Sequence, residues 1–265
     1  MYAFDYHQPA SVADAAAALA AAADGKLVAG GMTLIPTLKQ RLASPSDLID
    51  LARVDELKGI GEESGSLVIG AMTCHADVAA SDIVRRSIPA LARLAGGIGD
   101  PQVRNRGTIG GSVANNDPAA DYPAAVLGLG ATIRTNKRDI AADDFFQGMF
   151  TTALEPDELI TRIAFPVPQA AAYVKFPNPA SRYAVVGVLV AKTGGGVRVA
   201  ITGAGADGVF RATEMEQALS ADFSPKALDG IAIPPDGLNG DIHASSEYRA
   251  HLIGVMAKRA VAACV

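Results

Sequence analysis

Tryptophan is absent from this 265-residue chain, aromatic residues make up only 5% of it, and cysteine occurs only twice. Cys74 and Cys264 are too few and too distant in sequence to form a metal knuckle, an iron–sulfur cluster or a disulfide framework. The four histidines also lack the spacing of metal ligands. We therefore predict no metal site and two reduced thiols in a cytoplasmic protein. Any redox chemistry of this chain needs a borrowed cofactor.

Long hydrophobic runs and clusters of positive charge are missing too. No window offers the ~18 uninterrupted apolar residues that a bilayer crossing needs, and the net charge is −5 with no basic run. Nucleic acid and membrane surfaces are therefore unexpected partners. The apolar run Ala15–Ala23 is preceded by no Lys or Arg, which argues against a signal peptide. Ser11 as N-cap and Asp14 three residues later favour an amphipathic helix instead.

Small apolar residues are abundant. Hydrophobic residues reach 49% of the chain, and 51 of the 265 residues are Ala, which indicates Ala-rich helices packed closely against strands. The length allows one large or two modest domains. Proline at alternate positions in Phe165–Gln169 ends regular structure and marks a linker. We predict a first domain over 1–166 and a smaller α+β domain over 167–265.

Strands and helices alternate in the first part of the chain. The patterns predict strands at Tyr2–Asp5, Lys26–Ala29, Leu48–Asp50, Leu67–Gly70 and Ala131–Thr135, helices at Ser11–Ala23, Thr33–Leu42, Ser81–Ala95 and Ala124–Leu129, and a long loop over Gly96–Asp121. In the second part, Tyr183–Lys192 and Val197–Thr202 flank three glycines and predict an antiparallel hairpin. A final helix is predicted from Glu247, capped by Ser245 or Ser246.

The first glycine-rich site is Lys26–Pro36, in which a hydrophobic strand runs into Gly30-Gly31, a hydroxyl residue and a helix. Glycine lets a backbone approach a ligand closely, and free amides at a helix start favour an anion. A plain tight turn between strand and helix explains this segment equally well.

The second glycine-rich site is Arg106–Asp121, where Gly110-Gly111 are bracketed by Thr108 and Ser112 and followed by amide and carboxylate side chains. Such a loop can present backbone N–H groups and a hydroxyl to a diphosphate, and Asp121 could accept from a ribose hydroxyl. Two such loops in one chain are harder to explain as turns alone.

A third segment, Gly203–Gly208, matches G-x-G-x-x-G after a strand. The dinucleotide fingerprint also needs a βαβ unit whose second strand ends in an acidic residue about 20 residues later. Here the helix near Thr213–Ser220 leads into Asp222–Pro225 with no strand. We therefore predict a turn that leaves the hairpin.

The sequence also lacks a nucleophile elbow, a P-loop, HExxH and an obvious acid–base pair, so we predict no catalytic side chain.

At its two glycine loops the sequence resembles a known family. Ala29–Leu34 and Thr108–Ser112 are similar to the paired FAD-pyrophosphate motifs of the medium, flavoprotein subunits of molybdenum hydroxylases, the xanthine dehydrogenase and carbon monoxide dehydrogenase family. The resemblance extends over nearly the whole chain and includes Gly70–Asp77, Gln102–Arg106 and Arg182–Val186. It implies an α+β chain: a two-lobed FAD-binding domain of the vanillyl-alcohol oxidase (PCMH) type, then a small α/β C-terminal domain.

The resemblance also implies the cofactor-binding residues. The first loop would wrap the adenine side and the pyrophosphate, the second would hold the other side of the diphosphate, Asp121 would face a ribose hydroxyl, and Lys175 would face the flavin end. The ring contacts would be Ile160, Tyr183 and Ile98. The two loops consist of Leu27, Val28, Ala29, Gly30, Gly31, Met32, Thr33 and Leu34, and of Thr108, Ile109, Gly110, Gly111 and Ser112. Met32 departs from the polar residue common there, and His75 is expected only to make a structural hydrogen bond.

The implied function is electron transfer. Family members receive electrons at FAD from the 2Fe-2S clusters of a small subunit, while a large subunit carries the molybdopterin-type molybdenum cofactor and the substrate site. The resemblance implies an oxidoreductase subunit in a heterotrimer, doubled by symmetry. Two other readings stay open on the residues: a self-contained flavin oxidase or reductase of the same fold, and a flavin-free assembly scaffold.

Overall fold

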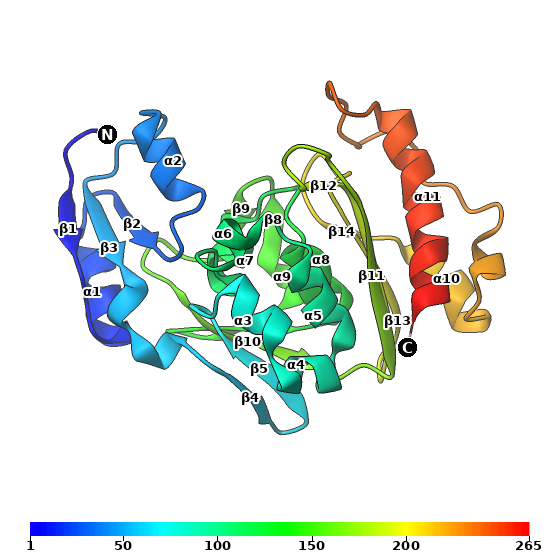
Figure 1. Cartoon of the computed structure of the whole chain (residues 1–265), viewed down its shortest axis with the longest axis horizontal. Coiled ribbons are helices and arrows are strands. Elements are labelled where there is room, and N and C mark those ends of the chain that lie inside the picture. The colour runs from blue at the N-terminus through cyan, green and yellow to red at the C-terminus, as the bar shows by residue number, and fades with distance from the viewer. Residues whose placement is uncertain (265) are drawn as a thin grey trace.

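The computed structural model describes residues 1–264 and begins with a small lobe built on a parallel sheet. Three strands lie in the order β1-β3-β2, so β3 is central and pairs with both neighbours. Figure 1 shows this lobe at the left, with α1 against the sheet and α2 above β2 and β3. Its elements are β1 (Asp5–His7), α1 (Val12–Ala21), β2 (Gly25–Val28), α2 (Leu34–Lys39) and β3 (Asp47–Asp50), then the short 3₁₀ turns Leu51–Arg53 and Asp55–Leu57.

A second lobe follows, built on a five-stranded antiparallel sheet in the order β4-β5-β10-β6-β7. Short helices pack on this sheet and form the main hydrophobic core. Its strands are β4 (Ile60–Glu63), β5 (Ser66–Gly70), β6 (Thr132–Thr135), β7 (Asp139–Ala141) and β10 (Ile160–Pro166), with a separate hairpin of β8 (Phe146–Gly148) and β9 (Thr151–Thr152). Its helices are α3 (His75–Ala80), α4 (Asp82–Ser87), α5 (Pro89–Gly96), α6 (Pro101–Arg104), α7 (Ile109–Asn115), α8 (Tyr122–Gly128) and α9 (Ala142–Phe145).

The C-terminal part is a four-stranded antiparallel sheet, β11-β12-β13-β14, covered on both faces. Helices α5 and α8 of the second lobe pack on one face, and α10 and α11 pack on the other, which Figure 1 shows at the right. Leu189 and Ala200 belong to the core of the second lobe, so this core crosses the predicted 166/167 boundary. The elements are β11 (Ala170–Pro177), β12 (Ala184–Thr193), β13 (Gly196–Thr202), β14 (Phe210–Arg211), α10 (Thr213–Ala221), a 3₁₀ turn (Pro225–Leu228) and α11 (Ser246–Ala263).

Several local predictions are confirmed. The Ser11 side chain caps α1 by accepting from the Asp14 backbone N–H. Ser245 caps the last helix, and β12 and β13 form the predicted hairpin. Gly203–Gly208 is a turn between two antiparallel strands, β13 and β14, so the third glycine motif lies outside any parallel unit. Within residues 1–264, no helix combines the length and apolar character needed to cross a membrane.

Three local predictions are wrong. The expected helix Ser81–Ala95 is two helices, because Pro89 begins α5 and disfavours helical geometry at Ile88, whose φ is −141°. The expected loop Gly96–Asp121 contains α6 and α7, which are too short to show a hydrophobic period but begin at side-chain caps, Asp100 and Thr108. The first strand lies slightly later than predicted, where Asp5–His7 pairs with β3.

Candidate functional site

The first glycine loop joins β2 to α2. Gly31 has a φ of +72°, a conformation that L side chains rarely adopt. No side chain caps α2, which follows Thr33 directly. The Ile35 N–H donates to the Gly31 carbonyl (3.0 Å) and Pro36 has no N–H, so Leu34 provides the N–H at this helix start that is available to a bound anion.

The second glycine loop is held by backbone hydrogen bonds to the segment after β5. The Gly110 N–H donates to the Ala71 carbonyl (2.9 Å) and the Ile109 N–H to the Thr73 carbonyl (3.1 Å). A Cβ on Gly110 would lie 2.5 Å from the Ala71 Cβ, so only glycine permits this approach. The Thr108 hydroxyl accepts from the Gly111 N–H (3.1 Å) and so begins α7.

The two loops are in direct contact although about 80 residues separate them. A Cβ on Gly30 would lie 2.0 Å from the Arg106 carbonyl oxygen, and one on Gly111 would lie 3.4 Å from the Ala29 Cβ. Real Cβ atoms essentially never approach another atom as closely as 2.0 Å. Glycine at position 30 is therefore what allows the backbones of both loops to form one wall.

A cavity of about 570 Å³ lies against this wall, at the junction of the two lobes and the C-terminal sheet. This volume is within the range of small-molecule sites. Fifteen of the eighteen predicted residues line it. They are Leu27, Ala29, Gly30, Gly31, Met32, Thr33, Leu34, Ile98, Thr108, Gly110, Gly111, Ser112, Asp121, Ile160 and Tyr183.

The other three predicted residues lie behind the lining. Ile109 is fully buried in the core of the second lobe, and Val28 lies at the end of β2, before the glycines. Lys175, on β11, points its Nζ at the Gly97 carbonyl (2.9 Å), the Arg182 carbonyl (2.9 Å) and the Asp121 carboxylate (3.0 Å). Since an ammonium has three donor hydrogens, these contacts use its full donor capacity. The Lys175 ammonium therefore bonds groups of the cavity wall and does not face the cavity itself.

Asp121 is a buried carboxylate of the wall with two side-chain partners. It is 4% exposed, accepts from the Tyr173 hydroxyl and forms the ion pair with Lys175. Burial raises the pKa of Asp121, while the Lys175 charge and the Tyr173 hydroxyl act in the opposite direction. This network joins β11 to the residue that precedes α8, and so fixes the C-terminal sheet against the floor of the cavity.

Several lining residues were not predicted individually, among them His75, Asp117, Ser181 and Arg182. Arg182 has a φ of +64° and donates to the Gly99 carbonyl (3.0 Å), so the segment before β12 closes over the segment before α6. The sequence signal that could have found them is their proximity to the motifs: His75 lies within Gly70–Asp77, and Arg182 adjoins Tyr183. Sequence adjacency alone could not reveal which side chains face inward.

His75 corrects one expectation. Its imidazole was expected to make a structural hydrogen bond, yet Nδ1 is buried and has no partner among residues 1–264. The side chain lies beneath the second loop, where a Cβ on Gly107 would be 2.5 Å from its Nε2. Burial, with a smaller contribution from the Arg104 charge, lowers the pKa of His75 to about 4. A neutral imidazole therefore lines the cavity at neutral pH.

The lowered pKa of His75 predicts an acid-sensitive fold. As the pH falls from about 6.5 to about 4, the unfolded chain gains a proton at this site and the folded chain does not, so stability declines over this window. We expect His75→Phe to remove this part of the decline. Urea unfolding of cofactor-free wild type and variant at pH 7.5, 6 and 5 measures it. Parallel pH profiles for the two proteins would contradict the prediction.

Comparison with known proteins identifies relatives over the whole length. The family described as the FAD-binding domain in molybdopterin dehydrogenase matches residues 2–168. The carbon monoxide dehydrogenase medium chain of Hydrogenophaga pseudoflava is 38% identical and covers 97% of this chain and 96% of its own. The nicotine 6-hydroxylase medium subunit of Paenarthrobacter nicotinovorans is 34% identical, with coverages of 97% and 95%. A solved carbon monoxide dehydrogenase from Hydrogenophaga pseudoflava, described as lacking the Mo-pyranopterin moiety, superposes with a TM-score of 0.88 at 38% identity, covering 98% and 96%. The two-lobed fold expected from the sequence is thereby confirmed.

Proposed function

Because the chain belongs to the family of FAD-binding domains of molybdopterin dehydrogenases, we propose that it is the FAD-binding electron-transfer subunit of a molybdenum-containing hydroxylase or dehydrogenase. The observation that carries the proposal is the direct contact of two glycine loops around one cavity of about 570 Å³. This arrangement supports a ligand with a central diphosphate and an extended shape, as FAD has.

The chain's own residues fit this cofactor. The Leu34 N–H at the uncapped start of α2 and the hydroxyls of Thr108 and Ser112 in the second loop can donate to the diphosphate from two sides. Apolar side chains suited to a flat ring system line the same cavity: Ile98, Ile160 and half-exposed Tyr183. We assign the adenine side of FAD to the first loop. The role of Asp121 toward a ribose hydroxyl stays a prediction. It is chemically possible because the carboxylate has lone pairs that Tyr173 and Lys175 do not use.

When bound, FAD supplies the ability to accept electrons singly and to release them as a pair. The protein contributes position and electrostatics. His75 stays neutral at neutral pH because burial lowers its pKa to about 4, and Lys175 balances the charge of Asp121. We propose that this chain has no catalytic side chain and does not oxidise the organic substrate by itself.

The names of the relatives support a multi-subunit assembly, because they are designated medium chain and medium subunit. We propose a small partner with two 2Fe-2S clusters that delivers electrons, and a large partner with the molybdopterin-type cofactor that carries the substrate site. A dimer of such heterotrimers and a cytoplasmic location are parts of the same proposal. The electrons then leave through an external acceptor such as NAD, a quinone, another carrier or oxygen.

The test is to express the chain with and without its genomic neighbours. We expect the purified chain to carry about one FAD, seen as yellow flavin absorbance and identified by chromatography after denaturation. Alone, it should not turn over organic substrates. In the complex, substrate should bleach the flavin only when the iron–sulfur partner is present. Turnover by the isolated chain would support a self-contained flavoenzyme, and a colourless chain in an active complex would support a scaffold.

A further inference from the structure

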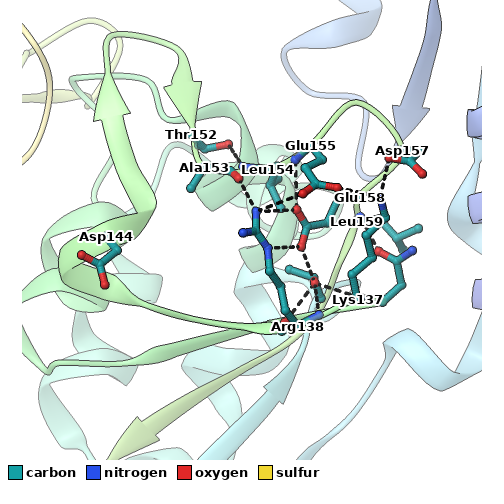
Figure 2. A network of polar contacts seen from close by, with 12 residues as sticks. Lys137, Arg138, Asp144, Thr152, Ala153, Leu154, Glu155, Asp157, Glu158 and Leu159 are labelled. Atoms are coloured by element: carbon teal, nitrogen blue, oxygen red, sulfur yellow. Dashed lines mark hydrogen bonds and ion pairs between the residues drawn. The ribbon is translucent and has the colours of Figure 1, made fainter.

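A dense polar network lies at the turn that enters β10 (Figure 2). The Glu158 side chain is fully buried and binds the Arg138 guanidinium through both oxygens, at 3.1 and 3.0 Å. It also accepts from the Thr135 hydroxyl (2.6 Å) and from the Glu155 backbone N–H (3.0 Å). Arg138 in turn donates to the Ala153 carbonyl (2.8 Å). A single buried carboxylate thus holds together the β6–β7 turn and the segment between β9 and β10.

The two residues after Glu158 are apolar and line the cavity. Leu159 is 1% exposed, and its backbone N–H donates to the Asn136 side-chain oxygen (2.9 Å). Its side chain packs in the core of the first lobe, with Leu19, Ile49 and Leu57. Among the described residues, the other buried members of that core all lie between residues 15 and 57, so Leu159 is the buried contribution from the later part of the chain. Ile160 follows at the start of β10, in the cavity wall.

From this arrangement we infer that Glu158 is a positioning residue: through Arg138, Thr135 and the Glu155 backbone it fixes the turn that places Leu159 across the boundary between the lobes and Ile160 against the cofactor. The inference rests on the proposed function, since it concerns the same cavity. Charge-assisted, bidentate bonds give this turn one geometry. A site held loosely by even 1 Å loses binding.

The state of the carboxylate agrees with this role. Burial by itself raises the pKa of Glu158, but hydrogen bonds from Arg138, Thr135 and the Glu155 backbone outweigh it and hold the pKa at about 2. Glu158 is therefore ionised at neutral pH. Glu155 lies in the same cluster but is half exposed and bonds Lys137 at the surface (2.8 Å). Its carboxylate also lies 3.9 Å from the Arg138 guanidinium, which is a long, exposed contact. Glu155 is therefore a matched control: the same side chain at the edge of the cluster, without the short buried bonds of Glu158.

The experiment compares Glu158→Gln with Glu155→Gln in the full chain. FAD is removed, the apoprotein is titrated with FAD by fluorescence quenching, and the visible circular dichroism of the bound flavin is recorded. We expect Glu158→Gln to weaken FAD binding by about tenfold and to change the flavin dichroism. Glu155→Gln should leave both within about twofold of wild type. Thr135→Val removes one bond to Glu158 and the bonds of the hydroxyl to the Lys137 and Arg138 N–H groups, but keeps the Arg138 pair. It should shift both quantities in the same direction by less, and it replaces Glu158→Gln if that variant does not fold.

A double-mutant cycle separates positioning from general destabilisation. If Glu158 acts by placing Leu159 and Ile160, then Glu158→Gln should change FAD affinity by less than twofold in a background that carries Leu159→Ala and Ile160→Ala. Equal effects in both backgrounds, or a wild-type flavin dichroism in Glu158→Gln, would overturn the inference. Wild-type protein that binds no FAD would instead refute the proposed function, so the two failures are distinguishable.

Discussion

Gly30→Ala is expected to yield a folded chain that no longer retains FAD. The new Cβ would lie 2.0 Å from the Arg106 carbonyl oxygen and 2.8 Å from the Gly107 Cα. These are backbone atoms that cannot rotate away, so the two loops must separate. Overpacking at such a point costs about 3 kcal/mol, which corresponds to an affinity for FAD lower by ~100-fold or more. The measurement is the flavin-to-protein ratio after purification, followed by titration of the apoprotein with FAD.

The matched control is Gly61→Ala. Gly61 lies in β4 and would place its Cβ with nothing within 4 Å, and its φ is outside the positive region. The variant should keep wild-type flavin content, and both variants should keep cooperative unfolding. Full retention of FAD by Gly30→Ala would show that the contact between the loops is not needed for binding.

Lys175→Met is expected to destabilise the chain by about 3 kcal/mol, because it leaves the carboxylate of Asp121 buried without its partner ion. Burial raises the pKa of Asp121 and Lys175 opposes this rise. In the variant, Asp121 should therefore take up a proton. A raised folded-state pKa gives stability that is present at low pH and is lost as the pH rises through it. The loss measured by urea unfolding should thus be larger at pH 8 than at pH 5.

Two further variants test this explanation. Adding Asp121→Asn to Lys175→Met removes the unpaired charge and should recover a large part of the lost stability. Lys58→Met removes an exposed pair with Asp55, and should cost less than ~1 kcal/mol. If Lys175→Met costs no more than Lys58→Met, the network of Lys175, Asp121 and Tyr173 does not hold the wall as described.

The sequence supported strong predictions where a local rule was sufficient. The strand, paired glycines and hydroxyl of each loop are short-range patterns, and all but two of the loop residues predicted to bind the cofactor do line the cavity. Caps at Ser11 and Ser245 follow from side-chain chemistry within three residues. Helices α6 and α7 were missed because four and seven residues are too few for a hydrophobic period to be recognised.

The long-range contacts could not be predicted from local sequence patterns. Nothing near Lys175 in the sequence indicates that its ammonium bonds carbonyls at Gly97 and Arg182. Likewise, Glu158 reads as one acidic residue in a polar turn, and its burial depends on Arg138, 20 residues earlier. Such pairs form only once separate strands are brought together.

The sequence by itself therefore determined the class of protein and its ligand chemistry: two anion-ready glycine loops, few cysteines, and a two-part chain that resembles flavoprotein subunits. The tertiary structure decided which of those groups share one cavity. It brought Gly30 against Arg106, turned the Lys175 ammonium toward Asp121 and away from the cavity lining, and placed Leu159 in the core of the other lobe. The physical reason is that backbone turns are governed by neighbours in sequence, whereas packing and charge pairing are governed by neighbours in space.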